Sequence, residues 1–138
     1  MCIRDRNYVN EWGTNYAGHF LVEASKLGYN VPQNVLNRWK KAQRKLSREW
    51  QYVNKRYSQN TQAYRLYTLA LSNEPEWGAM NRLRESNRLN TQAAWRLAAA
   101  YAVAGKPDVA KEITKDLESD IESYTELGGS YGLSLIHI

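Results

Sequence analysis

Segments that are apolar on most sides alternate in this chain with segments that carry one apolar stripe and a charged back. Residues 60–71 and 90–104 contain no acidic residue at all. A helix that is apolar all round must be covered on all sides, whereas a striped helix can face water. The alternation therefore predicts an inner layer made of the first, third and fifth helices and an outer layer made of the second, fourth and sixth.

The spacing of apolar residues predicts an all-α fold. Apolar side chains recur at threes and fours, and no Val/Ile-rich alternating run indicates a strand. Thr14 is the expected N-cap of the first helix, and Gly28 and Gly105 are the expected C-terminal caps of the first and fifth. The expected helices cover residues 14–27, 32–57, 60–71, 77–83, 90–104 and 107–117.

An internal repeat supports the pairing of these helices into hairpins. The tetrapeptide NTQA occurs at 60–63 and again at 90–93, and YRL at 64–66 is matched by WRL at 95–97. A period near 30 residues is the length of two short helices with two turns, which is one αα-hairpin. Stacked hairpins of this kind form either an α/α toroid or a helical solenoid.

The two ends of the chain are expected to be foreign to this fold. Residues 1–6, MCIRDR, and residues 133–138, LSLIHI, can be encoded by one DNA sequence and its reverse complement, which resembles a sequencing adapter translated at both ends. The genuine domain is then 7–132, a fragment of a longer protein. Cys2 and His137 lie in the foreign ends, so no thiol chemistry is expected. Apolar faces are expected to be exposed on the first helix and beyond Gly129.

Charge and composition exclude several classes of function. The formal net charge is +5, and the strongest basic run, 38–56, holds eight basic residues and one acid. Trp39 and Trp50 lie on the apolar stripe of that helix and not among its basic side chains, so we interpret the run as a solvated outer face and expect no nucleic acid partner. One Cys and two distant His residues lack metal-ligand spacing, and no metal or cofactor is expected.

Catalysis by this segment is not expected. A toroidal carbohydrate enzyme needs two carboxylates across a cleft, yet Glu23 is the only acid on the predicted inner helices from Asn15 onward. His19 lies beside Phe20 on an apolar helix without an evident nucleophile or carboxylate partner, which favours a hydrogen-bonded structural role. Most Trp and Tyr residues fit core stripes, whereas Trp12 is expected in a loop and outside the core.

The ordered motifs resemble a known domain. The segments EWGTNYAGHFLVEASKLGYNVPQNVLNRWKKAQRKL, QAYRLYTLALSNEPEWGAMNRLRES, AAWRLAAAYAVAGKPDVAKEI and ELGGSYG are similar to the thioester-type domain of bacterial alpha-2-macroglobulin family proteins. The resemblance implies part of an α/α toroid of the terpenoid-cyclase and complement thioester-domain kind. It also implies a much longer protease inhibitor of the periplasm or extracellular cell envelope, whose partners are proteases and other domains of the same chain, with no membrane insertion of this segment.

In that family, cleavage of a bait segment drives a collapse that traps the protease, and many members carry a Cys–Gln thioester in a CxEQ motif. This chain contains no CxEQ motif. Either the motif precedes this segment or the protein traps proteases sterically. The resemblance assigns Trp12, Gly13, Tyr16 and His19 to the neighbourhood of the thioester pocket, with Trp12, Tyr16 and His19 as its lining.

A tetratricopeptide-like scaffold for protein–protein interaction is the alternative. The segment WRLAAAYAVAGKPDVAKEI bears some likeness to that repeat, whose period is about 34 residues. The expected six-turn helix over 32–57 does not fit such a repeat and favours the toroid.

Overall fold

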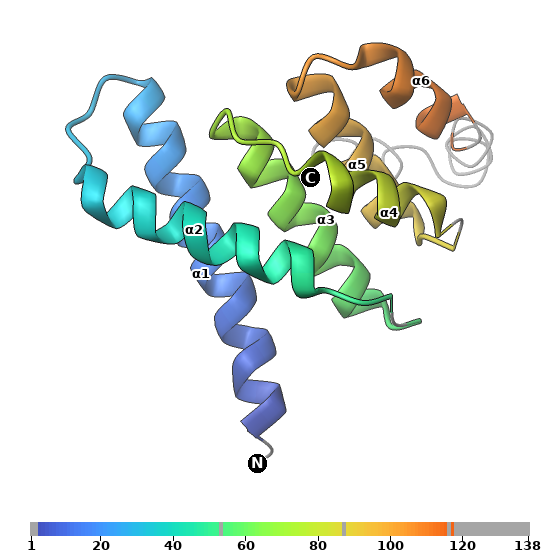
Figure 1. Cartoon of the computed structure of the whole chain (residues 1–138), viewed down its shortest axis with the longest axis horizontal. Coiled ribbons are helices and arrows are strands. Elements are labelled where there is room, and N and C mark those ends of the chain that lie inside the picture. The colour runs from blue at the N-terminus through green and yellow to red at the C-terminus, as the bar shows by residue number, and fades with distance from the viewer. Residues whose placement is uncertain (1–2, 53, 87, 116, 118–138) are drawn as a thin grey trace, which may run out of the picture.

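The computed structural model describes residues 3–52, 54–86, 88–115 and 117 of the chain, and side chains from residue 11 onward. Over these residues the fold is all-α, as predicted, with six helices and no strand (Figure 1). The helices are α1 (Ile3–Lys26), α2 (Gln33–Glu49), α3 (Arg56–Leu71), α4 (Trp77–Glu85), α5 (Thr91–Val103) and α6 (Pro107–Lys115).

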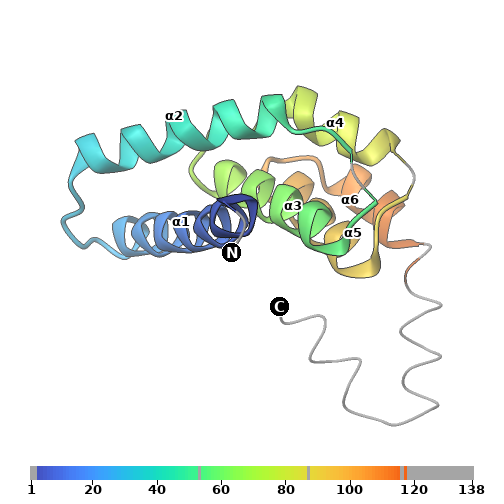
Figure 2. The same ribbon diagram turned by 90° about the horizontal axis from the view of Figure 1, so that it is seen from below.

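Helices α1 to α5 form the layers that the alternation of apolar and striped segments predicts, whereas α6, predicted in the outer layer with α2 and α4, has its main contacts with α5. Figure 2 shows α1, α3 and α5 in one layer, with α2 and α4 together on one side of it. Helix α3 packs against α1 and α5 within the layer, and against α2 and α4 above it, while α6 packs against α5. An α/α toroid and a helical solenoid both contain layers of this kind.

Helix α1 begins at Ile3 and not at Thr14, so the predicted N-cap was wrong. Thr14 lies inside the helix, and its carbonyl oxygen accepts a hydrogen bond from Trp39 Nε1 at 3.1 Å. Trp12 and Gly13, which were expected in a loop, are helical too. A Ser or Thr residue before an apolar run is only a local preference, and the packing of Trp12 against the Tyr64 ring of α3 outweighs it.

Helix α2 ends at Glu49, so the predicted six-turn helix over 32–57 was also wrong. Trp50 is its C-cap and has extended backbone angles, φ −63° and ψ 134°. The Trp50 indole N–H donates to Ser58 Oγ at 2.9 Å, and this bond ties the end of α2 to the first turns of α3. Helix α3 accordingly begins at Arg56, before the expected start at Asn60.

The two predicted glycine caps are confirmed. Gly28 and Gly105 have φ of 91° and 90°, which is the left-handed region that favours glycine after a helix. The Gly105 amide donates to the carbonyl of Ala102, and the Lys106 amide donates to the carbonyl of Tyr101. Helix α5 therefore ends where the sequence predicts, and α6 starts at Pro107.

The main core lies between α3, α4 and α5. On α4, Met80 and Leu83 are fully buried, whereas Trp77 is 38% exposed. The buried residues of this core are Ala63, Leu66, Ala70, Ala79, Met80, Leu83, Ala93, Leu97, Ala100 and Tyr101.

Helix α1 exposes the apolar face that the sequence assigns to it. Tyr16 and Phe20 are 65% and 69% exposed, and Leu27 is exposed as well. The α1 side chains that enter the protein lie on a different face, which includes Asn15 and Val22. The predicted exposure on the first helix is therefore present, while the exposure expected beyond Gly129 lies outside the described residues.

The two copies of the NTQA repeat meet in space. The Asn60 side-chain amide donates to Gln92 Oε1 at 3.0 Å, so the first residue of one copy contacts the third residue of the other. Their positions in the helices differ, because Asn90 is the N-cap of α5 whereas Asn60 lies inside α3. The repeat therefore marks two neighbouring inner helices, but its two copies lie at different positions relative to the helix starts.

Candidate binding groove

A groove with a volume of about 910 Å³ lies between α1, α3, α5 and α6. The three residues that the sequence analysis assigns to a pocket, Trp12, Tyr16 and His19, all line it. Gly13 is exposed and is not part of the lining. The remaining lining residues are Tyr64, Tyr67, Gln92, Trp95, Arg96, Ala98, Ala99, Ala102, Pro107, Ala110, Lys111 and Thr114.

Aromatic rings from two helices form one wall of the groove. The ring centroids of Trp12 and Tyr64 are 4.7 Å apart. His19 meets the Tyr64 and Tyr67 rings edge-on, with centroids 5.6 Å and 5.9 Å apart. Such tilted and edge-on pairs are the favoured arrangements of aromatic rings. The rings of this wall therefore contact one another across α1 and α3.

The guanidinium of Arg96 lies over this wall. Its Cζ is 5.1 Å from the Trp12 ring centroid and 5.5 Å from that of Tyr64, within the range of cation–π contacts. No hydrogen bond or ion pair joins Arg96 to any other residue that the structure describes. Burial lowers the pKa of Arg96, and the coulombic interaction with Tyr64 opposes that shift. An arginine keeps its positive charge despite such a shift.

His19 is held in its neutral form on the same wall. Burial lowers the pKa of His19 below 6.5, and Lys26 lowers it too, while Glu23 acts in the opposite direction. Burial also raises the pKa of Tyr64 to about 12, so its hydroxyl stays protonated at neutral pH. His19 Nδ1 is 2.8 Å from that hydroxyl, and Nε2 is 3.9 Å from Glu23 Oε1. The carboxylate favours the tautomer with its proton on Nε2, in which Nδ1 accepts from Tyr64.

The groove contains residues that the sequence analysis did not assign to a site. The sequence indicated three of them, Tyr64, Trp95 and Arg96, only as parts of the YRL and WRL repeat. A charged residue on an inner helix with no acid in the same segment is a signal that marks both Arg65 and Arg96, so it does not single out the groove residue. Aromatic residues were assigned mainly to core stripes, which holds for Tyr101 but not for Tyr16.

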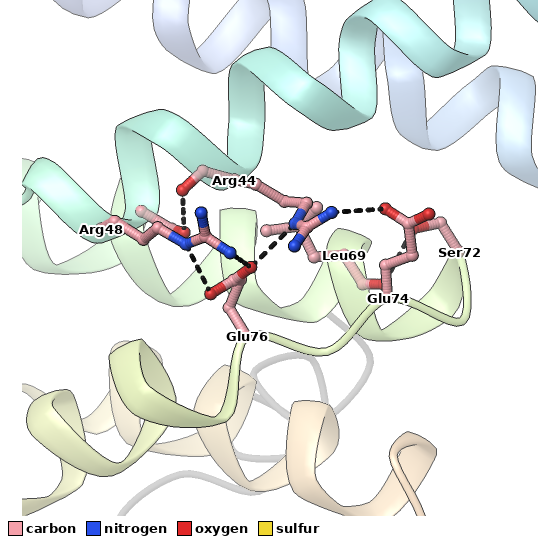
Figure 3. A network of polar contacts seen from close by, with 7 residues as sticks. Arg44, Arg48, Leu69, Ser72, Glu74 and Glu76 are labelled. Atoms are coloured by element: carbon pink, nitrogen blue, oxygen red, sulfur yellow. Dashed lines mark hydrogen bonds and ion pairs between the residues drawn. The ribbon is translucent and has the colours of Figure 1, made fainter.

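The basic face of α2 forms a second, separate surface, with a hollow of about 680 Å³ beside Lys40, Lys41 and Lys45. Figure 3 shows Arg44 and Arg48 turned toward Glu76, with Nε of Arg44 at 2.9 Å and Nη2 of Arg48 at 3.0 Å from Glu76 Oε1. Burial opposes ionisation of Glu76, but the hydrogen bonds from both arginines outweigh it and lower the pKa of Glu76 below 4.5. Part of the basic run is therefore neutralised by the segment before α4.

Trp39 is buried on the side of α2 away from its basic side chains, as the sequence analysis predicts. The basic face of α2 thus has no ring from Trp39 on which a base could stack.

No helix among the described residues has the length and apolar content that crossing a membrane requires. No three His, Cys, Asp or Glu side chains gather there as candidate metal ligands. In comparisons with known proteins, no family model, curated protein or solved structure matches the chain.

Proposed function

We propose that this chain is part of the α/α toroid of a bacterial alpha-2-macroglobulin-like protease inhibitor, and that it contributes to protease trapping without catalysis of its own. One observation carries the proposal. Trp12, Tyr16 and His19, which the sequence resemblance assigns to a thioester pocket, line one groove on the inner helices. The alternation of inner and outer helices agrees with the same fold type.

In this proposal, the aromatic wall would keep water away from a strained ester until the protease is trapped. Rings of Trp12, Tyr64 and Tyr67 offer few hydrogen bonds to water, and an excluded-water environment prevents hydrolysis of a reactive bond. Neutral His19 is already engaged with Tyr64 and serves as part of that wall. The thioester itself would come from a CxEQ motif outside this segment.

The decisive experiment uses the full-length parent, recovered by long-read sequencing across both ends. A trapped protease should still cleave a small peptide substrate while losing activity on a large protein substrate. The control is a protease inactivated at its active site, which cannot cut a bait and should leave the parent unchanged on a native gel. Equal cleavage of the large substrate with and without the parent would refute the inhibitor function.

A tetratricopeptide-like scaffold is the second candidate, and one observation favours it. The expected six-turn helix over 32–57, which argued against short repeats, is divided into α2 and the start of α3. The parent would then continue into further hairpins of about 34 residues. Flanking sequence separates the candidates, because a CxEQ motif within a β-rich reading frame supports the inhibitor and additional hairpins support the scaffold.

A further inference from the structure

We propose that the groove binds a short peptide segment that places an acidic side chain on Arg96 and an apolar side chain against the aromatic wall. The proposal concerns the groove of this chain itself and does not rest on either parent protein. Three observations support it: the position of the Arg96 guanidinium, the charges that line the groove and the length of the groove.

Arg96 presents its hydrogen-bond donors to the groove. The Trp12 and Tyr64 rings lie 5.1 Å and 5.5 Å from its Cζ and fix its position. A guanidinium carries five N–H donors in its plane, and no described residue accepts from those of Arg96. A carboxylate matches this donor set with two parallel hydrogen bonds, while the ring contacts remain in place.

The charges of the lining favour an anion. Among the residues that the structure describes, Arg96 and Lys111 are the cations of the lining, and none of its lining residues is Asp or Glu. Three acids on α1 and α6 belong to other contacts, since Glu11 pairs with Arg65, Glu23 lies beside His19 and Glu112 pairs with Arg84. An anionic group would therefore enter a positive potential without an opposing carboxylate in the groove wall.

The length of the groove favours an internal acidic side chain over a free chain terminus. Along α5 the lining runs from Gln92 to Ala102, a separation of ten helical steps, which is about 15 Å at 1.5 Å per step. That length accommodates about four or five residues of extended peptide. Arg96 lies four residues from the Gln92 end, so the ligand can continue on both sides of its acidic residue.

Apolar contacts would come from two kinds of lining residue. The aromatic residues Trp12, Tyr16 and Trp95 line the groove together with the small residues Ala99, Ala102 and Ala110. Aromatic rings together with small residues suit a bulky apolar side chain packed flat against the rings. Charge and shape together thus select an acidic residue that has an aromatic or aliphatic neighbour.

Isothermal titration calorimetry of the full 138-residue chain tests the proposal. The probes are two blocked pentapeptides, acetyl-Gly-Phe-Glu-Leu-Gly-amide and the same peptide with Gln in place of Glu. We expect the acidic peptide to bind about tenfold more tightly, because a charge-assisted pair replaces a neutral contact. Equal affinity for the two peptides, or no binding of either, would overturn the proposal.

Variants locate the binding site. Arg96→Gln should abolish the preference for the acidic peptide, and Arg96→Lys should retain only part of it because a lysine cannot form the paired contact. Arg38→Gln is the matched control, since Arg38 is exposed on α2 away from the groove and the substitution changes the net charge equally. An unchanged preference in Arg96→Gln, or an equal loss in Arg38→Gln, would contradict the assignment.

Two measurements test whether misfolding or self-association, and not loss of the peptide contact, explains the change in affinity. Lys111→Gln, at an exposed position on α6, should weaken the acidic peptide by about two- to threefold without a change in the melting curve. Sedimentation of the unliganded chain should give a monomer at the concentrations used. A dimer that Arg96→Gln dissociates would mean that a second copy occupies the groove, and would refute the peptide ligand.

Discussion

The indole ring of Trp39 lies directly on the backbone of α1 at Gly18, where a β-carbon would overlap the ring. One turn before Gly18, the Thr14 carbonyl accepts a hydrogen bond from the indole nitrogen at 3.1 Å. Trp39 is therefore held by α1 through both a polar and an apolar contact. The absence of a side chain at residue 18 is what lets α2 approach α1 this closely.

Gly18→Ala should destabilise the protein by about 1–3 kcal/mol, because the added methyl group displaces the Trp39 ring from a packed site. Gly13→Ala on the same helix is the matched control. A β-carbon at Gly13 meets nothing within 4 Å, so the change should stabilise α1 by about 0.5–1 kcal/mol. Urea denaturation followed by circular dichroism measures both. Equal effects of the two substitutions would contradict the contact.

The arginines of the YRL and WRL repeat should differ sharply in their contribution to stability. Arg65 is 2% exposed, and it donates to Gln43 Oε1 at 3.2 Å and to Gln62 Oε1 at 2.6 Å. Arg65→Met leaves two buried amide oxygens without a donor, removes the 3.5 Å ion pair with Glu11, and should destabilise the protein by about 2–4 kcal/mol.

Arg96→Met is the control for that substitution, since it removes only the contacts with Trp12 and Tyr64. Arg96→Met should lower the free energy of unfolding by about 0.5–1 kcal/mol, which is the usual contribution of a cation–π contact. Both are measured by chemical denaturation at neutral pH. A loss at Arg96 as large as that at Arg65 would make Arg96 a structural residue and remove the basis for ligand binding.

His19 should make the protein more sensitive to acid. Its folded pKa lies below the ordinary value of 6.5, mainly because of burial, so the unfolded chain binds a proton first as pH falls. The stability that neutral His19 contributes is therefore fully present above pH 6.5, and this contribution is lost as pH falls from 6.5 through the folded pKa. His19→Gln cannot titrate and should lose less stability between pH 7 and pH 5, measured as Tm. Parallel Tm curves for the two proteins would show that His19 does not titrate with folding.

The two asparagines of the NTQA repeat should respond differently to the same substitution. Asn90 Oδ1 accepts from the Ala93 amide at 3.0 Å as the N-cap of α5, so Asn90→Ala should destabilise by about 1 kcal/mol. Asn60→Ala removes one side-chain bond to Gln92 and a carbonyl oxygen that has no partner, and should have a smaller effect. Thermal unfolding compares them, and a larger effect at Asn60 would reject the assignment of Asn90 as the cap.

The sequence predicted the layers and several helix ends because those depend on local patterns. Helix α5 was placed correctly since Asn90 caps one end and Gly105 follows the other. Thr14 gave an equally clear start signal, but α1 continues through it because Trp12 packs against Tyr64, a contact between residues far apart in the chain. The end of α2 was missed for a related reason, since Trp50 bonds to Ser58 of the following helix.

The site was predictable only in part. The resemblance assigned Trp12, Tyr16 and His19 to a thioester pocket, which stays a prediction; in the structure these α1 residues share a groove with residues of α3, α5 and α6. Arg65 and Arg96 occupy matching places in the repeat, yet Arg65 contacts two glutamines and Glu11 whereas Arg96 lies over aromatic rings. That difference arises from the neighbouring helices, so it could not be predicted from the YRL and WRL motifs alone.

The burial of α3 determines how the chain can fold. Twelve of its sixteen residues are buried, several of them polar, and its neighbours include helices made both before and after it during synthesis. Neither the α1–α2 pair nor the α5–α6 pair can cover it alone. The described helices should therefore fold as one cooperative unit and not as hairpins that fold one after another, since α3 gains its full environment only once α5 has been made.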